Sequence, residues 1–430
     1  MTDLEKHIHT LTLFDTHEHL HKEARYVNEG PDIVQDLFDN YVAADLVVAG
    51  ARQADVERLV DGSNPDLAAR FAGVRDAWEK CQYTGYGEAV RWIARHVYSM
   101  DEITPESFGP AQERLEELRQ PGERLRILRD HGNLDHVQVD DFCWACLPDS
   151  SGTDFFLYDL SWRSFCDGEV DPAAIESEVG VRVVNLESLR ESMHAIFAKY
   201  APCAIAVKAQ HAYNRTLRWQ ERTDAEAGSV LEKVLSNRDV SEEELLCLGD
   251  WCWARGVELS IEHDLPFKLH TGSYGGHGFM PIDRIRAGNL CALLARYPEA
   301  RFVLMHIAYP YNDELVAIAK HYPNVHVDLC WAWSLDPYSA GDFVRRMIHA
   351  VPINKLFAFG GDAFWPNATV AYAAQSRLWL TEALSKEVQD GHLTESQAIG
   401  IATRLMQKNQ QECFDLDGTR SAIHKMAAVS

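Results

Sequence analysis

The chain has 430 residues, 46% of them hydrophobic and 25% charged, and its formal net charge is −24. The apolar share is sufficient for a large buried core, whereas the acidity argues against nucleic acid or anionic membrane as a partner, because phosphate binding needs clustered Lys and Arg. No apolar run approaches the roughly 20 residues of a membrane helix, and the N-terminus lacks the features of a secretory signal, so we expect a cytoplasmic protein.

Eight short segments with strand character recur along the chain. Several are almost continuously apolar up to a polar residue at the C-terminal end, which is typical of parallel strands buried on both faces. Amphipathic segments of helix length separate the later strands, and SEEE at 241–244 has the form of a helix N-cap with an acidic first turn. The alternation predicts an α/β fold, a (β/α)8 TIM barrel. The strand segments are residues 11–17, 134–141, 154–162, 203–211, 265–272, 301–308, 324–330 and 355–363.

The gap between the first two strands is far longer than an ordinary loop. It is rich in Arg, Glu, Ala and Leu and shows no strand alternation, so we expect several helices there. The predicted organisation is a barrel of residues 1–21 and 134–430, with a helical insertion, 22–133, after strand 1. Because barrel active sites lie at the carboxyl ends of the strands, the insertion should cap the substrate pocket or form its wall. From about 366 onward the chain is expected to be helical, with a frayed tail at 421–430.

Ionisable residues gather at the carboxyl ends of five predicted strands. His17 and His19 are two residues apart on one strand, so they point to the same face and can chelate one ion. Asp362 follows the last strand, which neighbours strand 1 in a closed barrel, and can act both as a ligand and as a base for a bound water. Imidazole and carboxylate suit a divalent transition metal such as zinc. The full set is His17, His19, Lys208, His270, His306 and Asp362.

Each of these residues also has a purely structural interpretation. His306 could be a satisfied core histidine, Lys208 could extend its amine to solvent, and Asp362 could cap the following helix. Their coincidence at one end of the same predicted barrel nevertheless favours metal-dependent chemistry, because that end carries the active sites of TIM-barrel enzymes.

Three further motifs are given weaker roles. His7 and His9 precede strand 1 on a short predicted helix, near the barrel end that carries stability rather than catalysis, so we do not expect them to bind the metal. His21 lies just past strand 1 and remains a candidate pocket residue. The ten cysteines are expected to be free thiols, and the CxxC pair at 143–146 has no matching second pair to complete a zinc site.

Five motifs together resemble the amidohydrolase superfamily: FDTHEHLH (14–21), AVKAQHAY (206–213), KLHTG (268–272), VLMHIAYPY (303–311) and FGGDAFW (359–365). The closer similarity is to the amidohydrolase-2 branch, including the domain that precedes glutamine synthetase in certain fungal and plant fusion proteins. The chain resembles uronate isomerases more distantly, and these also carry a helical insertion after strand 1. The resemblance covers residues 11–21 and about 134–410.

The resemblance implies a metal bound by His17, His19 and Asp362, with His270 as a further ligand or close to it. His306 is implied as a second-site ligand or a group that polarises the substrate. Lys208 matches a lysine that is carboxylated and bridges two metals in binuclear members. The expected cofactor is therefore one zinc ion, or two if Lys208 is carboxylated, and other divalent metals remain open. An unmodified Lys208 would instead offer a cation to the substrate or to charge developing in the transition state.

The predicted function is hydrolysis of an amide, lactone or ester bond in a small carboxylate-bearing substrate by a metal-activated water. Asp362, His306 and Lys208 are the expected catalytic residues, with Arg215 as the carboxylate-binding group. Two alternatives are a non-hydrolytic reaction, either uronate-type isomerisation or decarboxylation, and an inactive barrel that serves as a binding module. The sequence leaves homo-oligomer formation open. The predicted substrate-binding residues are Arg215, Tyr213, His277, Trp331, Trp333 and Trp365.

Overall fold

The computed structural model describes residues 1–427, and its centre is a sheet of eight parallel strands in the order of the chain. Every neighbouring pair from the first strand to the last is parallel. Backbone hydrogen bonds from Thr16 N to Phe359 O (3.1 Å) and from Asp362 N to His17 O (2.9 Å) connect the first strand to the segment after the last. The strands are β1 (Leu13–Glu18), β2 (Leu134–Val139), β3 (Phe156–Ser161), β4 (Ala204–Ala209), β5 (Phe267–Leu269), β6 (Phe302–Leu304), β7 (Val325–Asp328) and β8 (Leu356–Phe357).

These bonds make a nearly closed barrel, so the predicted (β/α)8 fold is confirmed. Each strand overlaps the segment predicted for it, and β1, β3, β4, β5, β6 and β8 are buried at every residue. Burial on both faces is the reason why several of them, such as β4 and β6, are almost continuously apolar.

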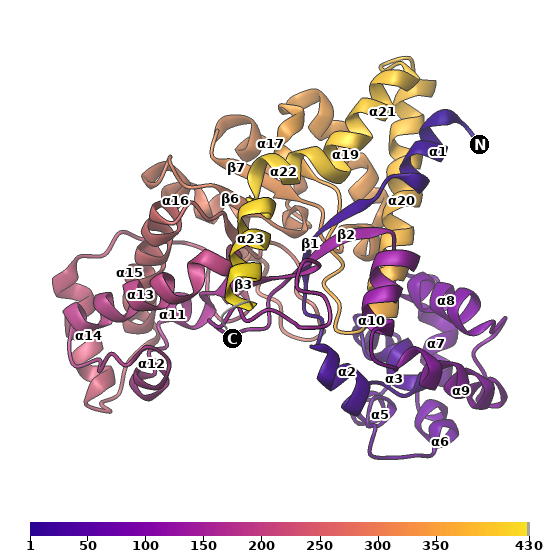
Figure 1. Ribbon diagram of the computed structural model, residues 1–430, viewed down its shortest axis with the longest axis horizontal. Helices are drawn as coiled ribbons and strands as arrows, with labels where there is room; N and C mark the ends of the chain where they lie inside the picture. The colour runs from indigo at the N-terminus through magenta and orange to yellow at the C-terminus, as the bar shows by residue number, and fades with distance from the viewer. Residues whose placement is uncertain (428–430) are drawn as a thin grey trace.

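Helices surround the barrel (Figure 1). The long α15 begins where the sequence indicates, because the Ser241 side chain accepts from Glu244 N and the Glu244 side chain accepts from Ser241 N. The helices between β3 and β8 are α11 (Arg163–Asp167), α12 (Pro172–Val179), α13 (Leu186–Tyr200), α14 (Asp224–Leu235), α15 (Glu242–Glu262), α16 (Cys291–Arg296), α17 (Asn312–His321), α18 (Ala332–Leu335) and α19 (Pro337–Ala350). Those after β8 are α20 (Pro366–Gln389), α21 (Glu395–Thr403), α22 (Asn409–Cys413) and α23 (Leu416–Ala427).

The stretch between β1 and β2 consists of helices and short turns, and Figure 1 shows them gathered to one side of the barrel, next to α20. Their shared core includes Leu37, Phe38 and Trp78. The helices are α2 (Glu23–Glu29), α3 (Ile33–Phe38), α4 (Val42–Val48), α5 (Gln53–Leu59), α6 (Leu67–Ala72), α7 (Arg75–Cys81), α8 (Gly85–Tyr98), α9 (Phe108–Leu118) and α10 (Glu123–Arg126).

The two ends of the chain form ordered helices. The N-terminal helix, α1 (Asp3–Thr10), packs its buried Leu4 and Ile8 near α20 and α21 (Figure 1). The predicted frayed tail is wrong as far as Ala427, because α23 is anchored by the buried Ile423 and by an ion pair between Arg420 and Asp135 (2.7 Å). Residues 428–430 of that predicted tail lie outside the described residues.

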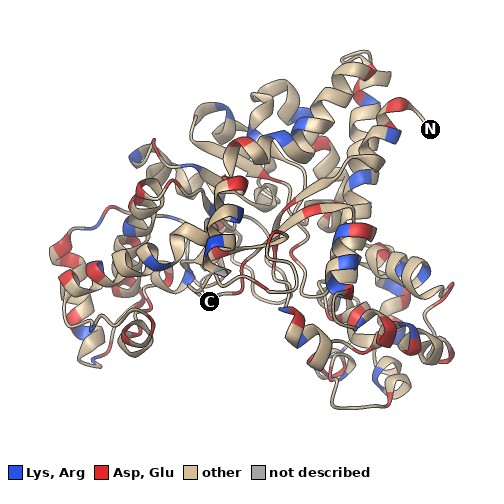
Figure 2. Cartoon of the chain, viewed as in Figure 1, with Lys and Arg blue, Asp and Glu red and all other residues tan. Residues whose placement is uncertain are grey.

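Figure 2 shows Lys and Arg interspersed with Asp and Glu along the outer helices. Within residues 1–427, none of the helices combines the length and the apolar character that crossing a membrane requires.

Candidate metal centre

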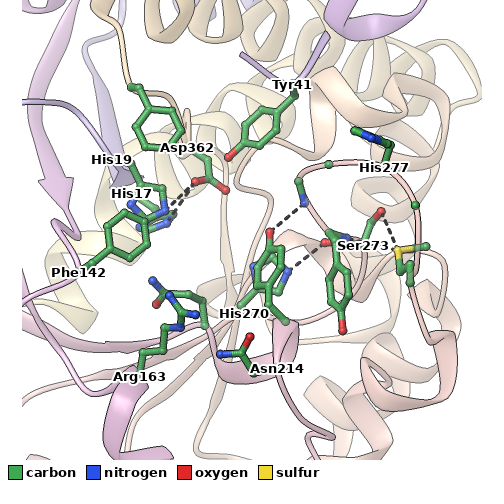
Figure 3. A pocket seen from close by; sticks show the side chains of 18 of the residues that line it. His17, His19, Tyr41, Phe142, Arg163, Asn214, His270, Ser273, His277 and Asp362 are labelled. Atoms are coloured by element: carbon green, nitrogen blue, oxygen red, sulfur yellow. Dashed lines mark hydrogen bonds and ion pairs between the residues drawn. The ribbon is translucent and has the colours of Figure 1, made fainter. Parts of the chain in front are cut away.

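The predicted ionisable residues lie together at the carboxyl ends of the strands. His17 belongs to β1 and Lys208 to β4. His19 and His270 directly follow β1 and β5, whereas His306 lies two residues past β6 and Asp362 five residues past β8. Figure 3 shows His17, His19 and Asp362 pointing toward one another. Because all strands of a parallel barrel end on the same side, residues from distant parts of the sequence meet in one site.

The side chains of His17 and His19 both approach the carboxylate of Asp362. Its Oδ1 lies 3.2 Å from His19 Nε2 and 3.4 Å from His17 Nε2. One donor atom from each of the three residues lies within 4.8 Å of the others. Two imidazole nitrogens and a carboxylate oxygen at this spacing match the three-ligand sites of catalytic divalent metals.

The hydrogen bonds of these side chains test whether a metal fits. His19 Nδ1 is 2.6 Å from the Asp140 carbonyl, so Nδ1 donates and the lone pair of Nε2 faces Asp362. Asp362 Oδ1 is buried and has no hydrogen-bond partner among the described residues. A lone pair and an unpartnered carboxylate oxygen that face each other are repulsive without a cation between them. The donor set therefore fits a divalent ion.

Electrostatics affect the protonation of two members of the triad. Burial would raise the pKa of Asp362, but the attraction of His17, His19 and His306 lowers it well below its usual value. Burial, together with Lys208, lowers the pKa of His17 well below 6.5. At neutral pH Asp362 is therefore a carboxylate and His17 a neutral imidazole.

Glu18 holds the turn that carries Asp362. Its Oε2 accepts from Ala363 N at 2.7 Å, and a Cβ at Gly361 would lie 2.0 Å from Oε1, so only glycine fits there. Asp362 itself has a φ of 58°, a left-handed backbone that an aspartate adopts at some cost. Burial raises the pKa of Glu18 well above its usual value, and burial also raises the pKa of Asp15 to about 7.

A cavity of about 790 Å³ opens above the triad. His17, His19, Lys208, His270 and Asp362 form part of its wall, and an aromatic and glycine-rich surface forms the rest. Lys208 Nζ lies 3.0 Å from His17 Nε2. The other lining residues are Tyr41, Val48, Phe142, Arg163, Gln210, Tyr213, Asn214, Ser273, Tyr274, Gly275, Gly276, His277, Gly278, Phe279, Met280 and Phe364.

Comparison with known proteins shows which family the chain resembles. The family model described as Amidohydrolase matches residues 203–395, which include Lys208, His270, His306 and Asp362. Protein fluG of Emericella nidulans is 28% identical over 176 residues, which are 40% of this chain and 20% of that protein. The chain is thus similar to amidohydrolases over residues 203–395, and its match to the fungal protein spans about a fifth of that relative's length.

Solved structures similar to this chain agree with it in fold. A uronate isomerase from Thermotoga maritima has a TM-score of 0.78 at 14% identity, covering 96% of both chains. A glucuronate isomerase from Caulobacter crescentus has a TM-score of 0.80 at 14% identity, covering 96% of this chain and 93% of that one. A protein from Lactobacillus casei described as a metal-dependent hydrolase has a TM-score of 0.66 at 13% identity, with both chains covered completely. Such low identities show the fold alone.

The structure brings three of the four predicted metal ligands into one group. His17, His19 and Asp362 converge, but His270 does not, because its Nε2 donates to the Ser273 carbonyl at 3.0 Å. Burial, assisted by the charge of Lys208, lowers the pKa of His270 to about 3. His270 is a neutral wall residue of the cavity.

His306 lies behind the wall of the cavity. It is fully buried, its Nε2 lies 3.9 Å from Asp362 Oδ2, and it is not among the residues that line the cavity. Its ring packs against His270 and Trp331, with centroid distances of 4.3 and 4.5 Å. A substrate in the cavity would meet His270 before it met His306.

Four of the predicted substrate-binding residues do not line the cavity. Arg215 is held by Asp250 (2.5 Å) and by the Cys166 carbonyl (2.9 Å), so its guanidinium is already paired in the core. Trp333 donates to the Ala358 carbonyl in the core, and Trp365 donates to Asp39. Trp331 packs behind His306 and His270. Tyr213 and His277 do line the cavity.

Two important cavity residues were missed by the sequence reasoning. Arg163 directly follows Trp162 at the end of β3, and Figure 3 shows it pointing into the cavity from the side facing the triad. Because Arg163 lies just after a predicted strand, its place at the cavity could have been predicted from the sequence. Tyr41 comes from between α3 and α4, where nothing in the helical periodicity distinguishes the residue that meets the barrel.

Proposed function

We propose that the chain is a hydrolase that uses a metal-activated water to cleave an amide, lactone or ester bond in a small carboxylate-bearing substrate. The observation that carries this proposal is the convergence of His17, His19 and Asp362 around an unpartnered carboxylate oxygen in the wall of a large cavity. The proposed ion is zinc, which two imidazoles and one carboxylate suit while a position stays open for water.

When bound, such an ion lowers the pKa of its water to roughly 7 and polarises the carbonyl oxygen of the substrate. His17 and His19 hold the ion through Nε2. Asp362 accepts the proton of the attacking water and delivers it to the leaving group, since its lowered pKa keeps it ionised at neutral pH. Because the Glu18 bond to Ala363 N fixes the turn, the carboxylate stays in place during both transfers.

Lys208 is the proposed electrostatic partner of the reaction. Its side chain is almost completely buried, and Nζ lies at the cavity wall beside His17. An ammonium in this position stabilises negative charge that develops on the substrate oxygen. His306 does not line the cavity, so the polarising role expected for it passes to Lys208 and the ion.

Arg163 takes over the carboxylate-binding role expected of Arg215. Its only ion pair in the described part of the chain is from Nε to Asp167 Oδ2 at 3.5 Å. Gln210 lies on the same cavity wall, is buried, and has no partner for either amide atom within residues 1–427. A guanidinium and an amide N–H together provide the paired donors that a carboxylate prefers. Tyr213 and His277 would contact the rest of the substrate.

The helical insertion, 22–133, is proposed to form one wall of the substrate pocket. Tyr41 and Val48, which both belong to it, line the cavity. The Tyr41 ring packs edge-on against Trp331 at 4.5 Å, which places the insertion directly against the histidine layer of the barrel. The insertion therefore affects which substrates fit, whereas the barrel supplies the chemistry.

Isomerisation of a uronate is the second candidate function. The observation in its favour is the likeness to uronate and glucuronate isomerases over 96% of this chain, which includes the insertion. In that reaction the same ion would hold a hydroxyl and a carbonyl oxygen while a base moves a proton between two carbons, and no water would be consumed.

Product analysis separates the two functions. Zinc-loaded protein is incubated with N-acyl amino acids, lactones and hexuronates, and products are identified by mass spectrometry in H₂¹⁸O. Incorporation of one ¹⁸O into a product carboxylate is expected. Conversion of a hexuronate to a keto-sugar without ¹⁸O in its carboxylate would replace hydrolysis with isomerisation. The Asp362→Asn variant is the inactive control for both.

A further inference from the structure

A second set of buried metal-type donors adjoins the triad. It consists of His306, Cys330 and Asp362, which come from the ends of β6, β7 and β8. One donor atom from each lies within 4.8 Å of the others, and all three residues are buried. The proposed hydrolysis uses neither His306 nor Cys330.

His306 has no partner that explains its burial. The side chain is fully buried, yet neither Nδ1 nor Nε2 has a hydrogen bond to any of residues 1–427. Burying an imidazole without hydrogen-bond partners is destabilising. The backbone is also strained, because His306, Ile307 and Ala308 have φ values of 63°, 47° and 49°. The fold thus holds an unpaired imidazole in place at a cost.

The backbone and the thiol of Cys330 are also held in place by their neighbours. Asp328 Oδ1 accepts from Cys330 N at 2.8 Å, and Asp328 Oδ2 accepts from the Thr16 hydroxyl at 2.5 Å. A Cβ at Gly360 would lie 2.9 Å from Cys330 Sγ, so the thiol occupies the space that this glycine leaves at the end of β8. The thiol is fully buried, and no hydrogen bond or disulfide is recorded for its Sγ within residues 1–427.

Asp362 connects the two sets of donors through different oxygens. Its Oδ1 faces His17 and His19, whereas its Oδ2 lies 3.9 Å from His306 Nε2. A carboxylate in this arrangement can bridge two ions, as in metal pairs about 3.5–4 Å apart.

We propose that His306, Cys330 and Asp362 form a second, sulfur-containing metal position in this protein. The ligand class is a borderline or soft divalent ion such as zinc or cobalt, because a thiolate and an imidazole prefer these to magnesium or calcium. On binding, the Cys330 S–H bond breaks, the proton leaves to solvent, and the sulfur forms a bond to the ion. This position differs from a binuclear centre built on a carboxylated Lys208, which contributes no sulfur.

Cobalt titration of the metal-free protein tests the proposal without any activity measurement. A cobalt–thiolate bond gives an intense sulfur-to-metal absorption in the near ultraviolet, which nitrogen and oxygen ligands do not give. The wild-type protein is expected to take up a second equivalent of cobalt together with this absorption. Cys330→Ser should lose the absorption and the second equivalent while keeping the first. Cys252→Ser, which alters an equally buried cysteine on α15, is the matched control and should keep both.

Two outcomes would overturn the proposal: saturation at a single equivalent without thiolate absorption, or an absorption that survives in Cys330→Ser. Should Cys330→Ser not fold, X-ray absorption of the zinc-loaded wild-type protein decides, since a sulfur neighbour at about 2.3 Å is required. The titration is repeated with and without bicarbonate. A second equivalent that depends on bicarbonate but carries no sulfur signal assigns that ion to carboxylated Lys208 and refutes the Cys330 position.

Discussion

Asp362 Oδ1 lies 3.2 Å from His19 Nε2 at the place where the barrel closes. Two backbone bonds fix this contact, from Asp362 N to the His17 carbonyl (2.9 Å) and from His19 N to the Ala363 carbonyl (3.1 Å). The same hydrogen bonds that connect β1 to the segment after β8 therefore assemble the donor triad. Barrel closure and metal binding are coupled, because neither strand alone supplies more than part of the site.

Replacing Asp362 by asparagine should remove both metal and activity. Asparagine has nearly the same shape but no charge, so it cannot offset the positive ion or accept the water proton. We expect zinc to fall well below one ion per chain and turnover to fall roughly 10²–10⁴-fold, the usual contribution of a general base. Elemental analysis and steady-state kinetics measure the two effects. Asp61→Asn, in an exposed loop of the insertion, should change neither. Full zinc content in Asp362→Asn would contradict the assigned ligand.

The double variant His7→Ala/His9→Ala should keep the wild-type metal content. Both residues lie on α1, His9 is exposed, and the nearest partner of His7 is the Thr403 hydroxyl at 2.8 Å. Loss of that bond should lower the free energy of unfolding by no more than about 1 kcal/mol. His17→Ala/His19→Ala is the matched comparison and should be metal-free. Loss of zinc from the α1 variant would refute the separation of the two histidine pairs.

The barrel and the paired histidines of the candidate site could be predicted from the sequence because both depend on local periodicity. Strands buried on both faces are mostly apolar, and a spacing of two puts His17 and His19 on the same face. The directions of side chains beyond a strand end follow no such rule. Arg215 turns back to Asp250 on α15, whereas Arg163 points into the cavity, and only the tertiary fold distinguishes these arginines. For the same reason Trp333, whose NH reaches the Ala358 carbonyl, could not be separated from a pocket tryptophan.

Arg163→Met should weaken substrate binding, whereas Arg215→Met should destabilise the fold. Removing Arg163 takes away a charged hydrogen bond to the substrate, so kcat/KM should fall roughly 10–100-fold, mainly through KM, with an unchanged melting temperature. Removing Arg215 takes one of two charged partners from the buried Asp250 and leaves Arg222 at 3.2 Å, so stability should fall by roughly 3 kcal/mol. Kinetics and thermal unfolding of both variants provide the comparison. If KM rose only in Arg215→Met, Arg215 rather than Arg163 would be the residue that binds the substrate carboxylate.

Asp36 on α3 connects this helix of the insertion to α8 and to α20 through two hydrogen bonds. Its Oδ2 accepts from the Tyr98 hydroxyl at 2.6 Å and from Asn367 Nδ2 at 3.0 Å, on α8 and α20. Burial raises the pKa of Asp36 to about 6, so the folded state holds its proton more tightly than the unfolded state does. The stabilisation is complete below the unfolded pKa of about 3.9 and is lost as pH rises through about 6.

Asp36→Asn should remove this pH dependence. The amide oxygen can accept the same two hydrogen bonds without becoming charged, so the variant gains stability relative to wild type as pH rises from about 4 to about 7. The expected gain is roughly 2–3 kcal/mol, since each unit of pKa shift corresponds to about 1.4 kcal/mol. Denaturant unfolding at pH 4.5 and pH 7.5 measures the difference between the two proteins. Asp61→Asn should show no such pH-dependent gain, and a constant difference between wild type and Asp36→Asn at both pH values would mean that Asp36 has an ordinary pKa in the folded protein.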